Sequence, residues 1–143
     1  MNAQALAVRA VLGTALAAAI ALAPQADAAT VKTTSDSCAA GSSFVAKLTL
    51  KYETTDGNHH PVSATMASGP YIGDSNTLFL RIFFVEHGET TNVYSRFWRG
   101  RIPARLTVPI PDDVTTPDSA TSYVSAAFSG GSGALCTAKA EIR

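Results

Sequence analysis

Apolar and polar residues alternate along residues 44–52, and this two-residue period restricts the possible folds more than any other feature of the chain. The apolar positions are Phe44, Ala46, Leu48, Leu50 and Tyr52, and the positions between them are Val45, Lys47, Thr49 and Lys51. Successive side chains of a β-strand point to opposite faces, so the pattern predicts a strand with one buried face and one face in water. Asp56-Gly57-Asn58 follows, and these residue types tolerate positive φ, so we expect a turn there.

Short apolar segments separated by turn residues continue down the chain. They predict strands at 62–66, 78–85, 90–99, 106–110, 123–128 and 134–142, with His87-Gly88-Glu89 as one of the turns. Segment 78–85 is apolar on both faces except at Arg81, which predicts a central strand buried on both sides. Pro109 predicts an edge strand, because proline has no N–H to donate. The residues at 68–76 and 129–133 are rich in Gly and Ser and predict loops.

These segments together predict the fold class. No stretch after residue 28 keeps a 3.6-residue period over three turns, so helix is expected only as a turn near Pro117–Thr121. Seven or eight short strands predict an all-β, single-domain antiparallel β-sandwich over residues 29–143, with a small β-barrel as the alternative. A segment of this length can bury one core and not two.

The first 28 residues have the pattern of a secretory signal peptide. Arg9 precedes an apolar centre from Ala10 to Ala23, and Ala26-Asp27-Ala28 offers small residues at the two positions that a signal peptidase recognises. The alternative is a transmembrane anchor, but a span needs about 20 apolar residues. We therefore expect cleavage before Ala29, no membrane span afterwards, and a secreted or periplasmic bacterial protein.

Cys38 and Cys136 are the two cysteines of the chain. An even number in an exported protein predicts a disulfide bond, which would join the beginning of the domain to its end. The alternatives are two free thiols or one reactive nucleophile. Neither cysteine lies near a histidine in the sequence, and there is no C-x-x-C motif, so the structural bond is favoured.

Charge excludes some classes of partner. The chain has 11 basic and 11 acidic residues and a formal net charge of zero, so we expect no nucleic-acid binding driven by overall charge. It also has no phosphate-binding glycine loop and no dinucleotide motif, so no cofactor is expected.

One stretch resembles the immunoglobulin-like domains. Leu106-Thr107-Val108, Thr116-Pro117-Asp118-Ser119-Ala120-Thr121 and Tyr123 are similar to the segment between the family's strands E and F, in which a tyrosine closes a corner onto the backbone. The resemblance covers about 20 residues and implies a Greek-key sandwich. Tyr123 comes one residue late, and Ser125 stands where the family has its second cysteine.

The groups that could support catalysis or hold a metal are few. His59 and His60 are adjacent, so they could share a metal with His87 only if they lay in a loop, and we expect exposed loop histidines instead. Ser132 lies in a glycine-rich segment with no helix after it, unlike the turn that presents a catalytic serine. We expect no metal site, no catalytic residues and no enzymatic activity.

The candidate binding residues are Arg96, Trp98, Arg99, Arg101 and Arg105. Arginine pairs with carboxylate, sulfate or phosphate in a two-point manner, and aromatic faces stack on sugars. On a strand, Tyr94, Arg96 and Trp98 would share one face, and Phe97, Arg99 and Arg101 the other. The alternative is an ordinary strand with Phe97 or Trp98 in the core and arginine stems lying over the sheet.

Three functions are compatible with these features. The favoured one is a non-enzymatic exported binding module that recognises an anionic glycan or protein partner through the Arg/Trp segment. The second is a structural, pilin-like assembly subunit with an unpaired edge strand. The third is a secreted inhibitor of a hydrolase such as lysozyme, because Ser68-Gly69-Pro70-Tyr71 is similar to the loop motif of periplasmic lysozyme inhibitors, although one residue shorter. The oligomeric state stays open.

Overall fold

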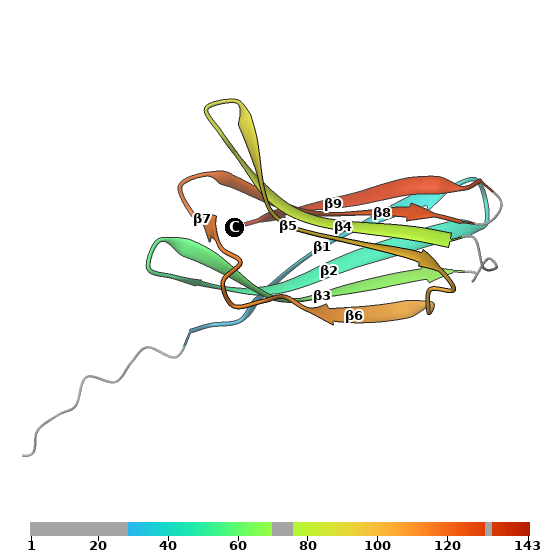
Figure 1. Cartoon of the computed structure of the whole chain (residues 1–143), viewed down its shortest axis with the longest axis horizontal. Coiled ribbons are helices and arrows are strands. Elements are labelled where there is room, and N and C mark those ends of the chain that lie inside the picture. Colours follow the sequence, from blue (N-terminus) through green and yellow to red (C-terminus); the bar gives the residue numbers. More distant parts are fainter. Residues whose placement is uncertain (1–28, 70–75, 131–132) are drawn as a thin grey trace, which may run out of the picture.

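The computed structural model describes residues 29–69, 76–130 and 133–143 as two antiparallel β-sheets stacked on each other (Figure 1). The strands are β1 (Lys32–Ala40), β2 (Phe44–Thr55), β3 (Asn58–Gly69), β4 (Asn76–Glu86), β5 (Glu89–Gly100), β6 (Arg105–Pro109), β7 (Thr116–Pro117), β8 (Thr121–Ser129) and β9 (Leu135–Ile142). One sheet has the order β1-β2-β3-β6, with β7 also paired to β3, and we call it sheet A. The other, sheet B, has the order β5-β4-β8-β9. The all-β sandwich predicted from the sequence is therefore confirmed.

Two tight turns set the register of the long hairpins. Asp56 and Gly57 connect β2 to β3 with φ of 52° and 74°, and His87 and Gly88 connect β4 to β5 with φ of 51° and 83°. Positive φ at both central residues is the geometry that matches the twist of a two-residue hairpin. Glycine adopts it without a steric penalty, which explains the position of Gly57 and Gly88 in the sequence.

The core fills the space between the inner faces of the two sheets. Sheet A contributes Phe44, Ala46, Leu48, Leu50, Tyr52, Ala64, Met66 and Val108, and sheet B contributes Leu78, Leu80, Ile82, Val124, Ala126, Phe128, Cys136, Ala138, Ala140 and Ile142. These positions alternate along each strand with more exposed ones, as the sequence period predicted. Burial of each large side chain contributes roughly 1.5–3 kcal/mol to folding.

A disulfide bond joins the two sheets at one margin. Cys38 on β1 is bonded to Cys136 on β9, with an S–S distance of 2.10 Å and Cα atoms 5.7 Å apart. Beside it, Lys139 N on β9 donates a hydrogen bond to Asp36 Oδ2 on β1 at 2.8 Å. The predicted pairing of the cysteines is confirmed, and the bond lies between strands that end the two sheets.

The structure corrects three sequence expectations about the strands. The described residues form nine strands instead of seven or eight, because Lys32–Ala40 pairs with β2 and Thr116–Pro117 pairs with β3, although neither was predicted to form a strand. The strand expected at 62–66 extends over the whole of β3. The outer face of β4 is half-buried at Phe79 and Arg81, because no third layer covers sheet B, and it is buried only at Phe83, beside Tyr123.

Other expectations have definite outcomes. Strand β4 is central, between β5 and β8, and β6 with Pro109 lies at a margin of sheet A, as predicted. The segment after β7 is a turn in which Ala120 N donates to Pro117 O at 3.3 Å. No helix in the described part of the chain is long and apolar enough to cross a membrane. The expected signal peptide at 1–28 and most of the expected loop at 68–76 lie outside the described residues.

The corner before β8 is closed by a serine. Ser122 is fully buried, and its Oγ donates to Pro117 O at 3.4 Å. Tyr123 is on the outer face of sheet B, where its ring lies 5.4 Å from that of Phe83 and 3.8 Å from Lys139 Nζ. The immunoglobulin-like resemblance implied that Tyr123 bonds the backbone at this corner. Ser122, the residue before it, makes that contact instead.

Candidate functional site

The structure divides the predicted Arg/Trp segment between the two sheets. Arg96, Trp98 and Arg99 lie on β5 of sheet B, whereas Arg105 begins β6 of sheet A. Arg101 lies in the connection between these strands. The five residues therefore do not form one continuous strand surface, although they fall within ten positions of the sequence.

On β5 the aromatic residues take opposite roles. Trp98 is half-buried and packs against the core, and the guanidinium of Arg96 lies 5.1 Å from the centre of its ring. Phe97 faces away from the core, is 59% exposed, and lies 6.4 Å from the ring of Phe79. The predicted distribution over two faces agrees with this arrangement. The indole is covered by the core and by Arg96, which leaves less of its face for a stacked sugar.

Arg105 belongs to a different surface, on the outer face of sheet A. Strand pairing places Arg105 opposite Ala67 on β3, and Ala67 opposite Lys47 on β2. Lys51 lies four residues further along β2, on the same face. These three cations flank a groove of about 350 Å³ that we call the sheet A groove. Among the described residues its lining is Lys47, Thr49, Lys51, Ser63, Thr65, Ala67, Arg105 and Thr107.

The floor of the sheet A groove is made of hydroxyl groups. Thr49, Thr65 and Thr107 form a row across β2, β3 and β6, and Ser63 lies beside Lys51. The hydroxyls of Thr65 and Thr107 are 3.0 Å apart and hydrogen-bonded. Hydroxyl groups both donate and accept hydrogen bonds, so the floor can bind sugar hydroxyls as well as anionic oxygens.

The charge of this lining is uniformly positive. The groove has three cationic side chains and no carboxylate, in a chain whose formal net charge is zero. Lys47, Lys51 and Arg105 are exposed, so their ammonium and guanidinium groups can meet a ligand without large desolvation. The sequence showed Lys47 and Lys51 on the wet face of their strand, but it did not show that Arg105 joins them.

The histidines do not form the exposed pair that was expected. His59 lies in β3, is only 4% exposed, and its Nδ1 is 3.0 Å from Thr54 Oγ1. Its ring meets that of Tyr52 edge-on at 5.7 Å. Burial lowers the pKa of His59. The negative charge of Asp118 acts in the opposite direction and raises this pKa, but by less. Within the described ranges, no three His, Cys, Asp or Glu residues are grouped so that they could hold a metal ion.

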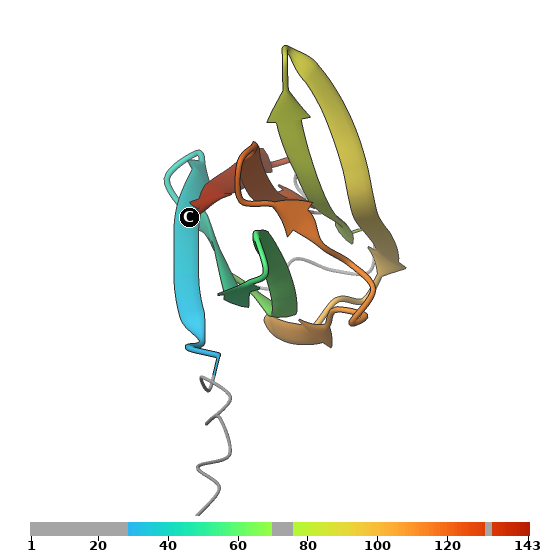
Figure 2. The same ribbon diagram turned by 90° about the vertical axis from the view of Figure 1, so that its left-hand side faces the viewer.

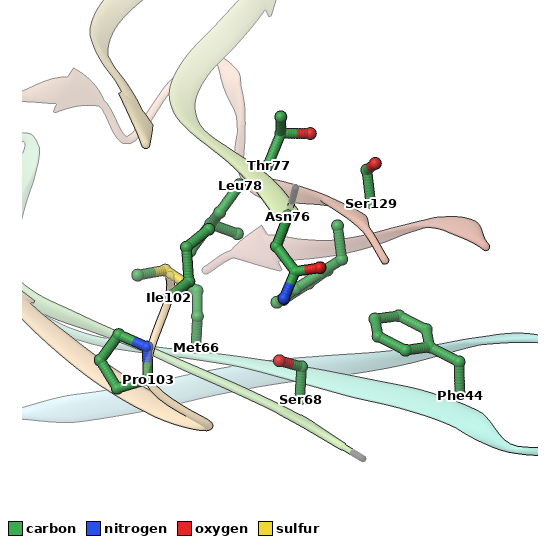
Figure 3. A pocket seen from close by; sticks show the side chains of 10 residues that line it. Phe44, Met66, Ser68, Asn76, Thr77, Leu78, Ile102, Pro103 and Ser129 are labelled. Atoms are coloured by element: carbon green, nitrogen blue, oxygen red, sulfur yellow. The ribbon is translucent and has the colours of Figure 1, made fainter. Parts of the chain in front are cut away.

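A small, partly open cavity lies between the two sheets at the end where β4 begins (Figure 3). It is lined by apolar residues such as Met66 and Leu78 and by the polar side chains of Ser68, Asn76 and Ser129. Asn76 Oδ1 is buried there with no hydrogen-bond partner among the described residues. The cavity volume is about 20 Å³, enough for about one water molecule and too small for an organic ligand.

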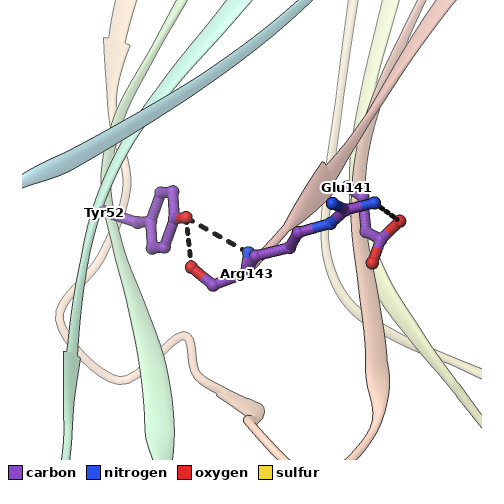
Figure 4. A network of polar contacts seen from close by, with 3 residues as sticks. All are labelled: Tyr52, Glu141 and Arg143. Atoms are coloured by element: carbon purple, nitrogen blue, oxygen red, sulfur yellow. Dashed lines mark hydrogen bonds and ion pairs between the residues drawn. The ribbon is translucent and has the colours of Figure 1, made fainter.

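Arg143, the residue that follows β9, is hydrogen-bonded to Tyr52 of sheet A (Figure 4). The Tyr52 hydroxyl donates to Arg143 O and accepts from Arg143 N at 3.1 Å. Arg143 Nη2 donates to Glu141 Oε2 at 3.0 Å, and this hydrogen bond lowers the pKa of Glu141. The network links the sheets near the disulfide-bonded margin and supports the fold more than a binding site.

Three residues of the sequence analysis lie outside the described part of the chain. They are Ser132 and Pro70-Tyr71, which belong to the catalytic-serine alternative and to the lysozyme-inhibitor resemblance.

No family model matches this chain. No curated protein and no solved structure matches it either. The molecule is described by its own structure: a two-sheet β-sandwich whose sheet A has a basic, hydroxyl-rich outer surface.

Proposed function

We propose that the protein is an exported, non-enzymatic binding module, and that the sheet A groove binds an anionic glycan. The observation that carries the proposal is the composition of the groove: three cations, four hydroxyl side chains and no carboxylate. The proposal keeps the binding of an anionic partner that was expected from the sequence. It assigns this binding to the sheet A groove, which contains Arg105, and not to β5.

The spacing of the cations favours a polymer with several charges over a single small anion. Lys47 and Lys51 are four residues apart on one strand, which corresponds to about 13 Å. Lys47 and Arg105 are two strands apart, which corresponds to about 10 Å. One sulfate cannot contact all three, whereas a glycan with a charge on successive sugars can. Arg105 can pair with a sulfate or carboxylate in a two-point manner, and the lysines act as point charges.

The arrangement of the histidines supports the non-enzymatic part of the proposal. His59 is buried against Tyr52 and Thr54, and His87 occupies a hairpin turn. His60 lies on the outer face of β3 but is not part of the groove lining, so none of the three histidines lines the groove as a general base would. The Cys38–Cys136 bond supports export, since disulfides persist in oxidising compartments.

The strand order supports an immunoglobulin-like architecture as part of the proposal. The order β5-β4-β8-β9 corresponds to C′-C-F-G of that fold, and β2-β3-β6 corresponds to A-B-E. In this assignment β6 is strand E and β8 is strand F, as the resemblance implied. The disulfide differs, because it joins the marginal strands β1 and β9 instead of strands B and F.

Retention on a column of immobilised sulfated glycan tests the function. The variant K47Q/K51Q/R105Q should elute at a clearly lower salt concentration than the parent, because it lacks the three groove charges. The matched control is K32Q/K139Q/R143Q, which removes three charges outside both the groove and β5 and should elute closer to the parent. Equal elution of the folded groove variant and the parent would contradict the proposal. Retention on an acidic peptide column only would indicate a protein partner instead.

A further inference from the structure

Strand β5 has the only long margin in the described part of the sandwich that the fold leaves uncovered. Sheet A ends in β1 and β6, and sheet B ends in β9 and β5. The margins of β1 and β9 are closed together by the disulfide and by the Lys139 N–Asp36 hydrogen bond. Strand β6 is five residues long and ends in Pro109. Strand β5 has twelve residues, most of which are exposed. It forms the outer edge of sheet B (Figure 2).

An open margin of this kind can pair with a further strand. The backbone N–H and C=O groups on the free side of an edge strand are available to another chain, and proteins usually block them with proline, lysine or a covering segment. Strand β5 contains neither proline nor lysine. A register shift at Ile82/Phe83 leaves Val93 of β5 without a partner, which is a β-bulge and the one edge-protecting irregularity in this strand, and pairing with β4 is regular on both sides of it.

The charges of β5 are divided between its two ends. Glu89 begins the strand and is paired with Glu86 across the turn, so this end is acidic. Arg96 and Arg99 lie near the other end, and both are exposed. A second β5 that runs antiparallel along the first would bring each acidic end beside a basic end. A parallel arrangement would bring like charges together, which is unfavourable.

We propose that β5 pairs with β5 of a second copy of this chain, antiparallel about a two-fold axis near Val93 and Tyr94. Glu89 of each copy then lies beside the Arg96–Arg99 segment of the other, and the two B sheets form one continuous sheet. Phe97, which is 59% exposed, becomes partly covered by the added strand. This pairing uses the one open margin of each copy, so assembly stops at a dimer and does not continue into a fibre.

The pairing is independent of the sheet A groove, which lies on the other sheet and faces outward. A dimer would carry two such grooves, and a polymeric glycan could contact both. Loss of the dimer would therefore weaken retention on the glycan column without removing it, whereas loss of the groove charges would leave the dimer intact.

Charge reversal with complementation tests the proposal by sedimentation velocity on the purified protein. The variants are E89K and R96E/R99E, and the matched control is K47E/K51E, which changes the net charge as much as R96E/R99E does. We expect the parent and the control to be dimers and each β5 variant to dissociate about tenfold more readily or worse, because each variant places like charges together. Mixing E89K with R96E/R99E should restore a dimer, since both contacts become attractive again.

Each other outcome overturns the proposal. These outcomes are a monomeric parent at about 100 µM, β5 variants that dimerise as the parent does, a mixture that stays monomeric, and assemblies larger than a dimer. Circular dichroism on each variant shows whether it keeps the β-sheet spectrum. A Phe97→Thr variant provides a second measurement, because it removes the exposed ring but keeps a residue that favours strands. It should weaken the dimer without lowering the unfolding midpoint at protein concentrations low enough for the parent to be monomeric, and an unchanged dimer would count against the proposed interface.

Discussion

Cys38 and Cys136 join the margins of the two sheets, with Cα atoms 5.7 Å apart and 98 residues between them along the chain. The bond encloses most of the domain, so it restricts the unfolded chain strongly. Because β1 and β9 belong to different sheets, it also holds one side of the sandwich closed.

Replacing both cysteines by serine should lower the free energy of unfolding by about 2–5 kcal/mol, because the open chain gains conformational entropy when it unfolds. Urea denaturation followed by fluorescence measures this change. The parent protein under reducing conditions should show a similar loss. An unchanged midpoint in both experiments would contradict a stabilising role for the bond.

Asp36 should contribute to the same margin through its side chain. Its Oδ2 accepts a hydrogen bond from Lys139 N at 2.8 Å, so Asp36→Ala should cost about 1–2 kcal/mol. Asp36→Asn keeps an acceptor at this position and should cost less. Denaturation curves of the two variants decide the matter, and equal losses would show that the hydrogen bond is not the source of the effect.

Tyr52→Phe should lower the free energy of unfolding by about 1 kcal/mol, because the hydroxyl bonds both N and O of Arg143. The ring stays in the core, so the packing is retained. Hydrogen exchange at the end of β9 should become faster in this variant. If exchange there is unchanged, the hydroxyl does not hold the end of the strand.

Stability should fall in acid partly through His59. Burial lowers the pKa of His59 in the folded protein below the ordinary value of 6.5, so the unfolded chain binds a proton more readily. The contribution of neutral His59 to the free energy of unfolding is complete above about pH 6.5. It is lost as the pH falls from the pKa of His59 in the unfolded chain to its lower pKa in the folded protein.

Urea midpoints measured at several pH values between 7.5 and 5 test this dependence. His59→Gln should flatten the dependence, whereas His60→Gln, a change at the adjacent residue on the other face of β3, should keep most of it, because the charge of His60 is the smallest cause of the lowered pKa of His59. A His59→Gln protein with the same slope as the parent would mean that other groups cause the loss in acid.

Local patterns in the sequence predicted much of the fold. The alternation from Phe44 to Tyr52 and the turn residues Gly57 and Gly88 each depend on neighbours in the chain, and their structures agree with the prediction. Strand β1 was missed because the inward-facing positions of Lys32–Ala40 are small or polar. Its place depends on pairing with β2 and on the disulfide, both of which are tertiary contacts.

The candidate site was harder to predict for a related reason. Arg105 is close to Arg101 in sequence but lies on the other sheet from β5, beside Lys47. That neighbourhood requires the pairing of β2 with β3 and of β3 with β6, which no local pattern specifies. The alternating lysines at 47 and 51 were the one sequence signal for the groove, and they were visible only as a wet strand face.

An NMR titration of the protein with a defined sulfated oligosaccharide tests the central claim most directly, because it reports binding at each backbone amide. We predict that the largest chemical-shift changes fall on Lys47, Thr49, Lys51, Thr65, Arg105 and Thr107, and that they disappear in K47Q/K51Q/R105Q. Changes concentrated on β5 with none in the groove, or no changes at millimolar oligosaccharide, the weak end of measured affinities, would contradict the account.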